Sequence, residues 1–299
     1  MNKVSNSNSF LIKNKNNIFY FGFIFTFIFT WLYIPLSWDD SYISYRYALN
    51  LVNGNHWNWN NDNDVVEAYT NFSYAGLSIV PIYLKVDPTL FFKILNLIWI
   101  IILFYRLKND LKSLSLFFIS MMILIFNPFV HYHAATGMET IFFFFLIFES
   151  GRCVLLDSKN KEHEKYFYIL LLILPLTRPE GIVYSIVFFI LYIKDGFSTI
   201  KSIKTLILLF LIAITYMFCR YSYFGKLFPN TFYLKSIKSL SIVNFIKFID
   251  DTKLYFLVLI ILNFIIKNKI YLIISILTVS IALLVYAPAD LNTIINDRF

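Results

Sequence analysis

The chain has 299 residues, of which 59% are apolar, 20% aromatic and 15% charged, and its mean hydropathy is +0.66. Ordinary soluble domains are about half apolar and a quarter charged, so the composition predicts an integral membrane protein and excludes collagen-like, disordered and disulfide-scaffold classes. The formal net charge of +8 is spread over the segments between apolar runs, so we expect no nucleic-acid partner.

Apolar runs recur along the sequence after a polar segment, residues 1–17, that is rich in Asn, Ser and Lys. A spanning helix needs about 20 apolar residues, and shorter runs span only with flanking Tyr, Lys and Arg or as broken helices that line a cavity. We predict an all-α, polytopic protein with about nine spans, between eight and ten, in one transmembrane domain over residues 18–287. The predicted spans are residues 18–36, 89–105, 113–130, 140–156, 166–177, 182–193, 205–219, 254–266 and 270–287.

Lys and Arg predict the orientation, because they collect in cytoplasmic loops. If residues 72–84 form an interfacial or re-entrant helix rather than a tenth span, the N-terminal segment and the most basic loops share one side, which we assign to the cytoplasm. This assignment predicts a first outer loop over residues 37–88 and a short outer tail over residues 288–299. The unusual polar residues then gather in outer loops, which predicts a polar chamber that opens to the outside.

The segment directly after the first predicted span, residues 38–48 (WDDSYISYRYA), is the most informative. If it is helical, Asp39 and Arg46 lie along one face and Asp40 along the next. Adjacent carboxylates raise each other's proton affinity unless a cation or metal offsets the repulsion, which suits a general base. Arg46 would then receive an anionic leaving group such as phosphate. The spacing alone slightly favours the simpler alternative, an N-capping Asp with a surface partner.

Further along this loop, Glu67, Tyr69 and Asn71 offer donors and acceptors at a spacing suited to binding hydroxyl groups. They follow Trp57 and Trp59, whose rings are either anchors at the membrane interface or platforms on which sugar faces stack. Each of these signals is weak when taken singly.

Three later segments combine charge with turn residues. Glu139 opens an apolar helix, either as a cap that the helix dipole stabilises or as a carboxylate facing the chamber. Residues 177–181 (TRPEG) predict either two half-length helices that line a cavity or a tight outer hairpin with an internal Arg–Glu pair. Residues 223–235 fit either an outer loop that binds an anionic lipid headgroup or a plain interfacial loop.

Four sequence blocks, in the same order, resemble bacterial GT-C class membrane glycosyltransferases. The nearest group contains the mycobacterial terminal arabinofuranosyltransferase and its uncharacterised proteobacterial relatives. The first block is similar to the first outer loop of that group, and the other three are similar to its later blocks. The blocks are residues 39–51 (DDSYISYRYALNL) with 66–72 (VEAYTNF), 136–140 (TGMET), 177–181 (TRPEG) and 225–231 (GKLFPNT).

The resemblance implies an enzyme of cell-envelope polysaccharide biosynthesis. It would transfer a sugar, with inversion, from a polyprenyl-phosphate donor to a glycan or lipid acceptor on the outer face of the bacterial inner membrane. An acidic residue of the first outer loop is the expected base in that class, and here it falls on Asp39 or Asp40. No cofactor is certain, a divalent cation stays open, and metal ligands are unknown.

The remaining site residues that the resemblance implies fall into two groups. Cations near the outer surface would stabilise the developing charge of the lipid phosphate. These cations are Arg46, Arg178 and Lys235. The side chains expected to bind the sugar or the acceptor are Glu67, Tyr69, Asn71, Glu139, Glu180 and Asn230.

The sequence also departs from the pattern of the group. Ala68 stands where the group usually has Gly, and residues 287–299 are only loosely similar to its last outer block, so we expect a truncated or divergent copy. Two alternatives therefore stay open. One is a transporter or polymerase component for lipid-linked glycans, and the other is a non-catalytic remnant of the glycosyltransferase family.

Overall fold

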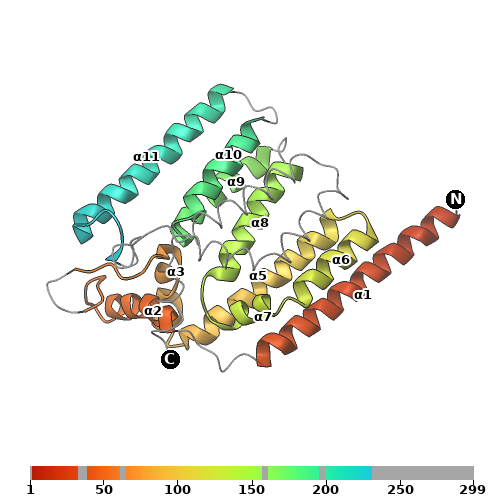
Figure 1. Ribbon diagram of the computed structural model, residues 1–299, viewed down its shortest axis with the longest axis horizontal. Helices are drawn as coiled ribbons and strands as arrows, with labels where there is room; N and C mark the ends of the chain where they lie inside the picture. The colour runs from red at the N-terminus through yellow and green to blue at the C-terminus, as the bar shows by residue number, and fades with distance from the viewer. Residues whose placement is uncertain (1, 33–38, 61–64, 157–160, 195–198, 231–299) are drawn as a thin grey trace, which may run out of the picture. The chain divides into compact units, whose positions relative to one another are not determined.

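The computed structural model describes residues 2–32, 39–60, 65–156, 161–194 and 199–230 (Figure 1). Every regular element in these ranges is an α-helix, which confirms the predicted helical class. The helices are α1 (Asn2–Leu32), α2 (Asp39–Val52), α3 (Phe72–Leu77), α4 (Ile79–Tyr83), α5 (Pro88–Asp110), α6 (Leu114–Ile125), α7 (Pro128–Ala135), α8 (Thr140–Leu156), α9 (Lys161–Thr177), α10 (Gly181–Lys194) and α11 (Thr199–Phe224).

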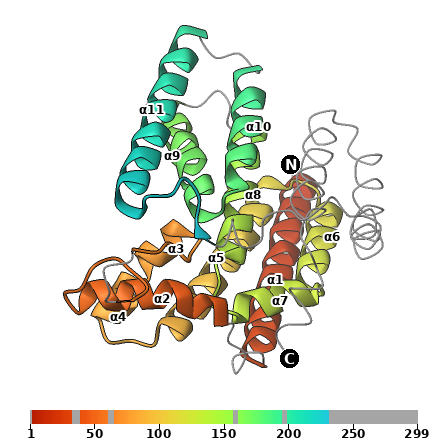
Figure 2. The same cartoon turned by 60° about the vertical axis from the view of Figure 1, so that its left-hand side comes forward.

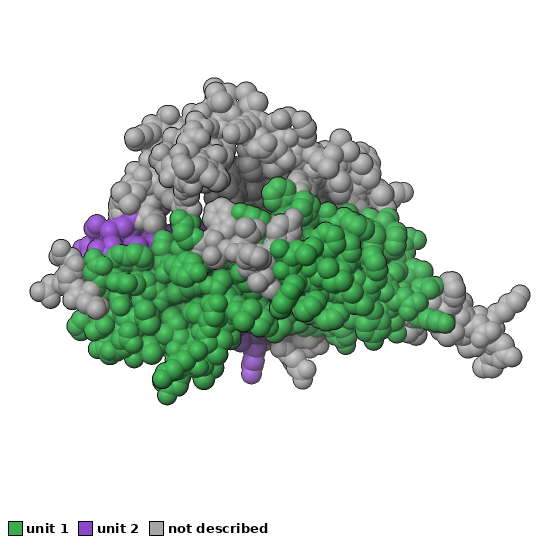
Figure 3. All heavy atoms as spheres, turned by 90° about the horizontal axis from the view of Figure 1, so that it is seen from below, with its two compact units in different colours: residues 1–61, 71–146 green, residues 62–70, 147–299 purple. Residues whose placement is uncertain are grey.

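The chain divides into two compact units, which Figure 3 colours separately. Unit 1 comprises Met1–Asn61 and Asn71–Leu146, and therefore contains α1 to α7 and the beginning of α8. Unit 2 comprises Asp62–Thr70 and Ile147–Phe299, and in its described part contains the rest of α8 with α9, α10 and α11.

Two helices in the described residues are long and apolar enough to cross a membrane: α5 and the segment Ile207–Phe224 of α11. The pair α6 and α7 adds a third candidate if the two helices together make one bent span. Helices α8, α9 and α10, with 17, 17 and 14 residues, are shorter than a full crossing. The predicted runs 254–266 and 270–287 lie outside the described residues. The structure therefore supports a membrane protein with two or three candidate spans.

Helix α1 exposes large apolar side chains and buries small ones. Large apolar side chains such as Phe21, Ile24 and Ile28 are exposed on it. Its buried stripe instead carries small residues at four-residue intervals, Gly22 and Thr26 and then Thr30. Small residues allow helices to approach closely in a membrane. A Cβ on Gly22 would lie 2.5 Å from Cε of Met121 in α6, so α1 and α6 are in close contact there.

The predicted run 113–130 is not one helix, because α6 ends at Ile125 and α7 begins at Pro128, with a bend of 55° between them. Pro128 lacks the backbone N–H that would continue α6, and Asn127 caps α7 by accepting from the N of Phe129 over 3.0 Å. His131 Nε2 lies 2.6 Å from the carbonyl O of Ile125, so it satisfies one of the carbonyls left open at the end of α6.

Stacked aromatic rings hold α2, α3 and α5 together in unit 1. The ring of Phe92 lies 4.1 Å from that of Tyr74 and 5.7 Å from that of Tyr45, between ring centroids. All three residues are buried. Aromatic residues contribute most of the apolar area in such cores, and here they fix α2 against α5. The polar residues of α2 are thereby held in one position.

Candidate functional site

Helix α2 places the two neighbouring carboxylates, Asp39 and Asp40, in its first turn. The exposed Asp39 accepts a hydrogen bond through Oδ1 from the backbone N of Asp40 over 2.9 Å, which satisfies one backbone N–H of the first turn. Asp40 is half-buried. Both carboxylates lie at the positive end of the helix dipole. The two side chains therefore differ mainly in their access to solvent.

A chain of buried polar side chains joins α2 to the beginning of α8 within unit 1. Ser44 Oγ donates to Oδ1 of Asn71 over 2.9 Å, and Nδ2 of Asn71 donates to Oε2 of Glu139 over 2.8 Å. None of the three residues is more than 8% exposed. Asp40 lies four residues before Ser44 and hence on the same face of α2. The predicted residues Asn71 and Glu139 are thus in contact with each other and, through Ser44, with α2.

Tyr45 makes a second link between α2 and the segment before α8. Its hydroxyl donates to the carbonyl O of Gly137 over 3.2 Å. Burial raises the pKa of the Tyr45 hydroxyl far above its ordinary value, so the group stays protonated and remains a donor. Gly137 has a φ of +72°, and a Cβ there would lie 3.1 Å from the Tyr45 hydroxyl oxygen. Glycine is therefore required at this position by conformation and by space.

Sequence reasoning missed Asn96, a fully buried amide in the apolar helix α5. Its Oδ1 accepts from the hydroxyl of Tyr74 over 3.1 Å, and its Nδ2 donates to the carbonyl O of Met138 over 3.1 Å. Met138 directly precedes Glu139, so Asn96 helps to set the backbone that presents this carboxylate. A single amide inside a long apolar run was the available signal, because such a group needs partners inside the protein.

Arg46 lies on the exposed side of α2 and interacts with an aromatic side chain of the same unit. Its Nε donates to the carbonyl O of Trp59 over 3.2 Å, and its guanidinium lies 5.9 Å from the centroid of the Trp59 ring. Because Ser44 and Arg46 are two residues apart on a helix, their side chains point to nearly opposite sides. Arg46 is therefore directed away from the buried, hydrogen-bonded side chains that begin at Ser44.

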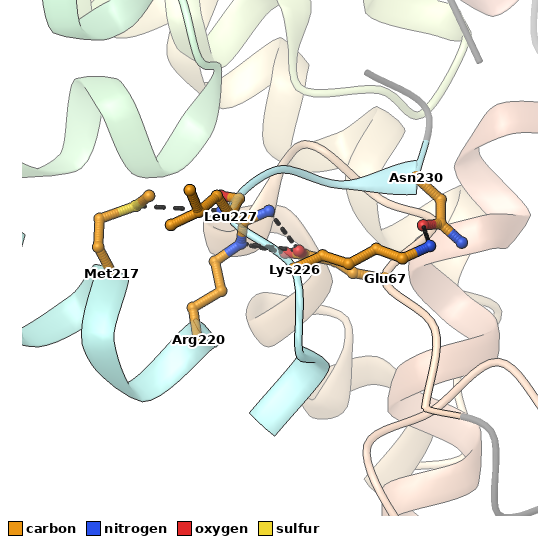
Figure 4. Close-up of polar contacts among 6 residues, drawn as sticks. All are labelled: Glu67, Met217, Arg220, Lys226, Leu227 and Asn230. Atoms are coloured by element: carbon orange, nitrogen blue, oxygen red, sulfur yellow. Dashed lines mark hydrogen bonds and ion pairs between the residues drawn. The ribbon is translucent and has the colours of Figure 1, made fainter. Parts of the chain in front are cut away.

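In unit 2, Glu67 and Arg220 form a buried ion pair (Figure 4). Nε of Arg220 donates to both carboxylate oxygens of Glu67, over 2.9 and 2.7 Å, and its NH2 group lies 2.5 Å from Oε2. Their side chains are only 5% and 8% exposed, for Glu67 and Arg220 respectively. Burial raises the pKa of the Glu67 carboxyl above its ordinary value, and the hydrogen bonds and charge of Arg220 oppose this rise. The sequence predicted Glu67 but not its partner at the end of α11.

The loop after α11 closes over this ion pair. NH1 of Arg220 donates to the carbonyl O of Leu227, and the backbone N of Asn230 donates to the carbonyl O of Glu67 over 2.9 Å (Figure 4). The side chain of Asn230 accepts from Nζ of Lys226 over 2.8 Å. Hence Glu67 and Asn230, from two separate blocks of the sequence, are in contact.

One other predicted residue of unit 2 has a packing partner, and another lies outside the described residues. Tyr69 is 3% exposed, and its ring packs edge-on against that of Phe224 at 6.5 Å between centroids. Lys235 lies outside the described residues.

The segment 177–181 forms the tight hairpin, which was one of its two predicted arrangements. Helices α9 and α10 lie side by side in Figures 1 and 2, and Ser185 Oγ bonds the carbonyl O of Leu171 over 2.8 Å across them. NH1 of Arg178 lies 3.5 Å from Oε1 of Glu180, so the predicted Arg–Glu pair is internal to the turn. A Cβ on Gly181 would overlap the backbone of Leu174, which explains the glycine.

Within the described ranges, no three His, Cys, Asp or Glu side chains are grouped closely enough to hold a metal ion. No family model, curated protein sequence or solved structure matches this chain. Function must therefore be inferred from the chemistry of the side chains that each unit brings together.

Proposed function

We propose that this protein is an integral membrane glycosyltransferase of the GT-C type, with about nine spans. It would move a sugar from a polyprenyl-phosphate donor to a cell-envelope glycan or lipid acceptor on the outer side of the bacterial inner membrane, with the N-terminus in the cytoplasm. The observation that carries the proposal is the hydrogen-bonded chain Ser44–Asn71–Glu139 in unit 1. It joins two of the blocks that resemble this class.

The energetic cost of such a chain supports a functional interpretation. Buried polar and charged groups in a membrane protein are expensive and gather where a polar substrate or a proton pathway needs them. Asn71 orients the Glu139 carboxylate through one hydrogen bond, and Asp40 lies on the same face of α2 as Ser44. In this proposal the Asp40 carboxylate is the base, and the Glu139 carboxylate accepts hydrogen bonds from sugar hydroxyl groups.

The proposed reaction assigns one role to each group. The Asp40 carboxylate accepts the proton of the acceptor hydroxyl while that oxygen attacks the anomeric carbon of the donor. The bond between this carbon and the phosphate oxygen breaks, and its electron pair leaves with the polyprenyl phosphate, so the configuration inverts. Within unit 1, Glu139 and Asn71 hold sugar hydroxyl groups.

The test uses the full chain in lipid nanodiscs with a panel of polyprenyl-phosphate sugars, and measures donor binding and sugar transfer or donor hydrolysis. We expect turnover in the wild type, and a loss of about 100-fold or more in Asp40→Asn with donor binding retained. Asp110→Asn, the same change at the end of α5, is the matched control and should leave turnover unchanged. Equal turnover in Asp40→Asn and wild type would remove the assigned base.

A lipid-linked-glycan transporter is the second candidate, because the 55° break between α6 and α7 resembles the broken helices found at transport sites. Movement of a lipid-linked glycan across vesicles without any sugar transfer would favour this function over the transferase.

A further inference from the structure

A second surface of unit 1 combines exposed aromatic and cationic groups on a rigid loop. Trp59 retains 37% exposure, and the guanidinium of Arg46 lies 5.9 Å from its ring centroid. Trp57 is half-buried beside it. An exposed indole with a planar set of N–H donors at its side offers an apolar face and hydrogen-bond donors to the same ligand.

Two contacts with α2 fix the aromatic rings in place. The fully buried Tyr47 lies under both of them, with ring centroids 5.7 Å from that of Trp57 and 6.3 Å from that of Trp59. Nδ2 of Asn50 donates to the carbonyl O atoms of Asn58 and Trp59 over 2.7 and 3.1 Å. These side chains therefore lose their conformational entropy when the protein folds and not when a ligand binds, which favours affinity.

Backbone bonds complete the loop between α2 and these rings. The N of Asn55 donates to the carbonyl O of Asn50 over 2.9 Å, and Gly54 adopts a φ of +82° that turns the chain back. Oδ1 of Asn58 accepts from the N of Trp59 over 2.8 Å. An aromatic side chain that served only as a flexible lipid anchor would not need a loop held at this many points.

We propose that Arg46 and Trp59, supported by Trp57, form a binding surface for a glycan chain. A pyranose or furanose ring places C–H groups on one face and hydroxyl groups around its edge. The indole would cover the C–H face, and the guanidinium would donate hydrogen bonds to the hydroxyl groups. Because Arg46 and Ser44 point to nearly opposite sides of α2, this surface is separate from the candidate catalytic face.

The surface would hold an extended glycan chain on the side of α2 away from Ser44. The proposal does not depend on the transferase function, since a glycan can bind this surface without any transfer. A failure of the transfer assay and a failure of the binding assay are therefore distinguishable.

The binding test uses the full chain in nanodiscs and soluble hexasaccharides of arabinofuranose, mannose and glucose as probes. We expect at least one probe to bind the wild type, binding to weaken about tenfold or more in Trp59→Ala and in Arg46→Ala, and Trp59→Phe to keep part of the affinity. Trp31→Ala changes an exposed tryptophan of α1 and is the matched control, with no change expected. Absence of binding by all three probes, or equal binding by Trp59→Ala and wild type, would overturn the proposal.

A second measurement separates a glycan surface from a lipid anchor. Lipids with brominated acyl chains quench tryptophans that enter the bilayer. The emission of Trp59 is obtained as the difference between wild type and Trp59→Phe, and that of Trp31 in the same way. We expect strong quenching of Trp31 and little of Trp59, and equal quenching of both would show that Trp59 is an anchor.

Discussion

Asn71 donates a hydrogen bond to Glu139 over 2.8 Å, although the two residues are 68 positions apart in the chain. The oxygen of the same amide accepts from Ser44. An amide can accept from a hydroxyl and donate to a carboxylate at the same time, which neither a carboxylate nor an aliphatic side chain can do. Asn71 is therefore the residue through which α2 and the start of α8 are joined.

Replacing Asn71 should reveal how much this junction contributes to stability. Asn71→Ala leaves the buried Ser44 and Glu139 side chains without this partner, and we expect the free energy of unfolding to fall by about 1–3 kcal/mol. Asn71→Asp should cost more, because it places a second carboxylate against Glu139. The measurement is unfolding in detergent, followed by intrinsic fluorescence. The control is Asn53→Ala at an exposed position, and equal unfolding of the two alanine variants would contradict the proposed junction.

The buried ion pair of Glu67 and Arg220 predicts a large loss of stability when Arg220 is replaced, which a second substitution partly restores. Arg220→Met leaves the Glu67 carboxylate buried beside an apolar side chain, so we expect a destabilisation of about 3–5 kcal/mol. Adding Glu67→Gln to Arg220→Met removes the uncompensated charge and should recover part of this loss.

A double-mutant cycle on the unfolding free energies measures the coupling between the two positions. If the losses of the two single variants simply add in the double variant, the pair contributes nothing beyond its separate side chains, and the expected coupling is absent.

Two glycines offer a matched pair of Gly→Ala changes. At Gly181, the new Cβ would overlap the backbone of Leu174, so Gly181→Ala should strongly destabilise the hairpin between α9 and α10. At the helical Gly76, the structure places nothing within 4 Å of a new Cβ. Gly76→Ala should therefore be neutral or stabilise the protein by about 0.4–1 kcal/mol. The measurement is the melting temperature of each variant against the wild type. Equal melting temperatures for Gly181→Ala and Gly76→Ala would contradict the close contact between Gly181 and Leu174.

Local patterns predicted the helices well where an apolar run alone defines the element. The run 140–156 coincides with α8, because both its ends are marked by a change from apolar to polar residues. The run 113–130 is divided between α6 and α7, which together remain one candidate span with a bend, and Asn127 and Pro128 carried the signal for a cap and a new start. Hydropathy counts apolar residues and does not register such a break.

The candidate site was harder to predict because its partners are distant in sequence. Glu67, Asn71 and Glu139 could be selected as polar residues between apolar runs, but no spacing rule pairs Glu67 with Arg220, which lies 153 positions away. Asn96 was missed for a related reason. Its role depends on a hydrogen bond to the carbonyl O of Met138, and only the fold brings these two residues together. Such pairings follow from helix packing rather than from local pattern.

The two carboxylates of α2 should respond differently to the same substitution. Asp39 is exposed and bonds the backbone N of Asp40, whereas Asp40 is half-buried on the face that Ser44 shares. If Asp40 is the general base, Asp40→Asn removes the proton acceptor and should lower kcat by about 100-fold or more. Asp39→Asn keeps a side-chain oxygen that can accept the same capping bond, so kcat should change only a few-fold.

The comparison needs transfer rates at saturating donor, together with donor affinity, for both variants. Retained affinity with a lost kcat in Asp40→Asn distinguishes a missing base from a damaged helix, because unfolding of α2 would lower both. A larger loss in Asp39→Asn would assign the base to the exposed carboxylate. Unchanged kcat in both variants would remove the two carboxylates of α2 from the chemistry, and the buried carboxylate of Glu139 would then be tested as the base.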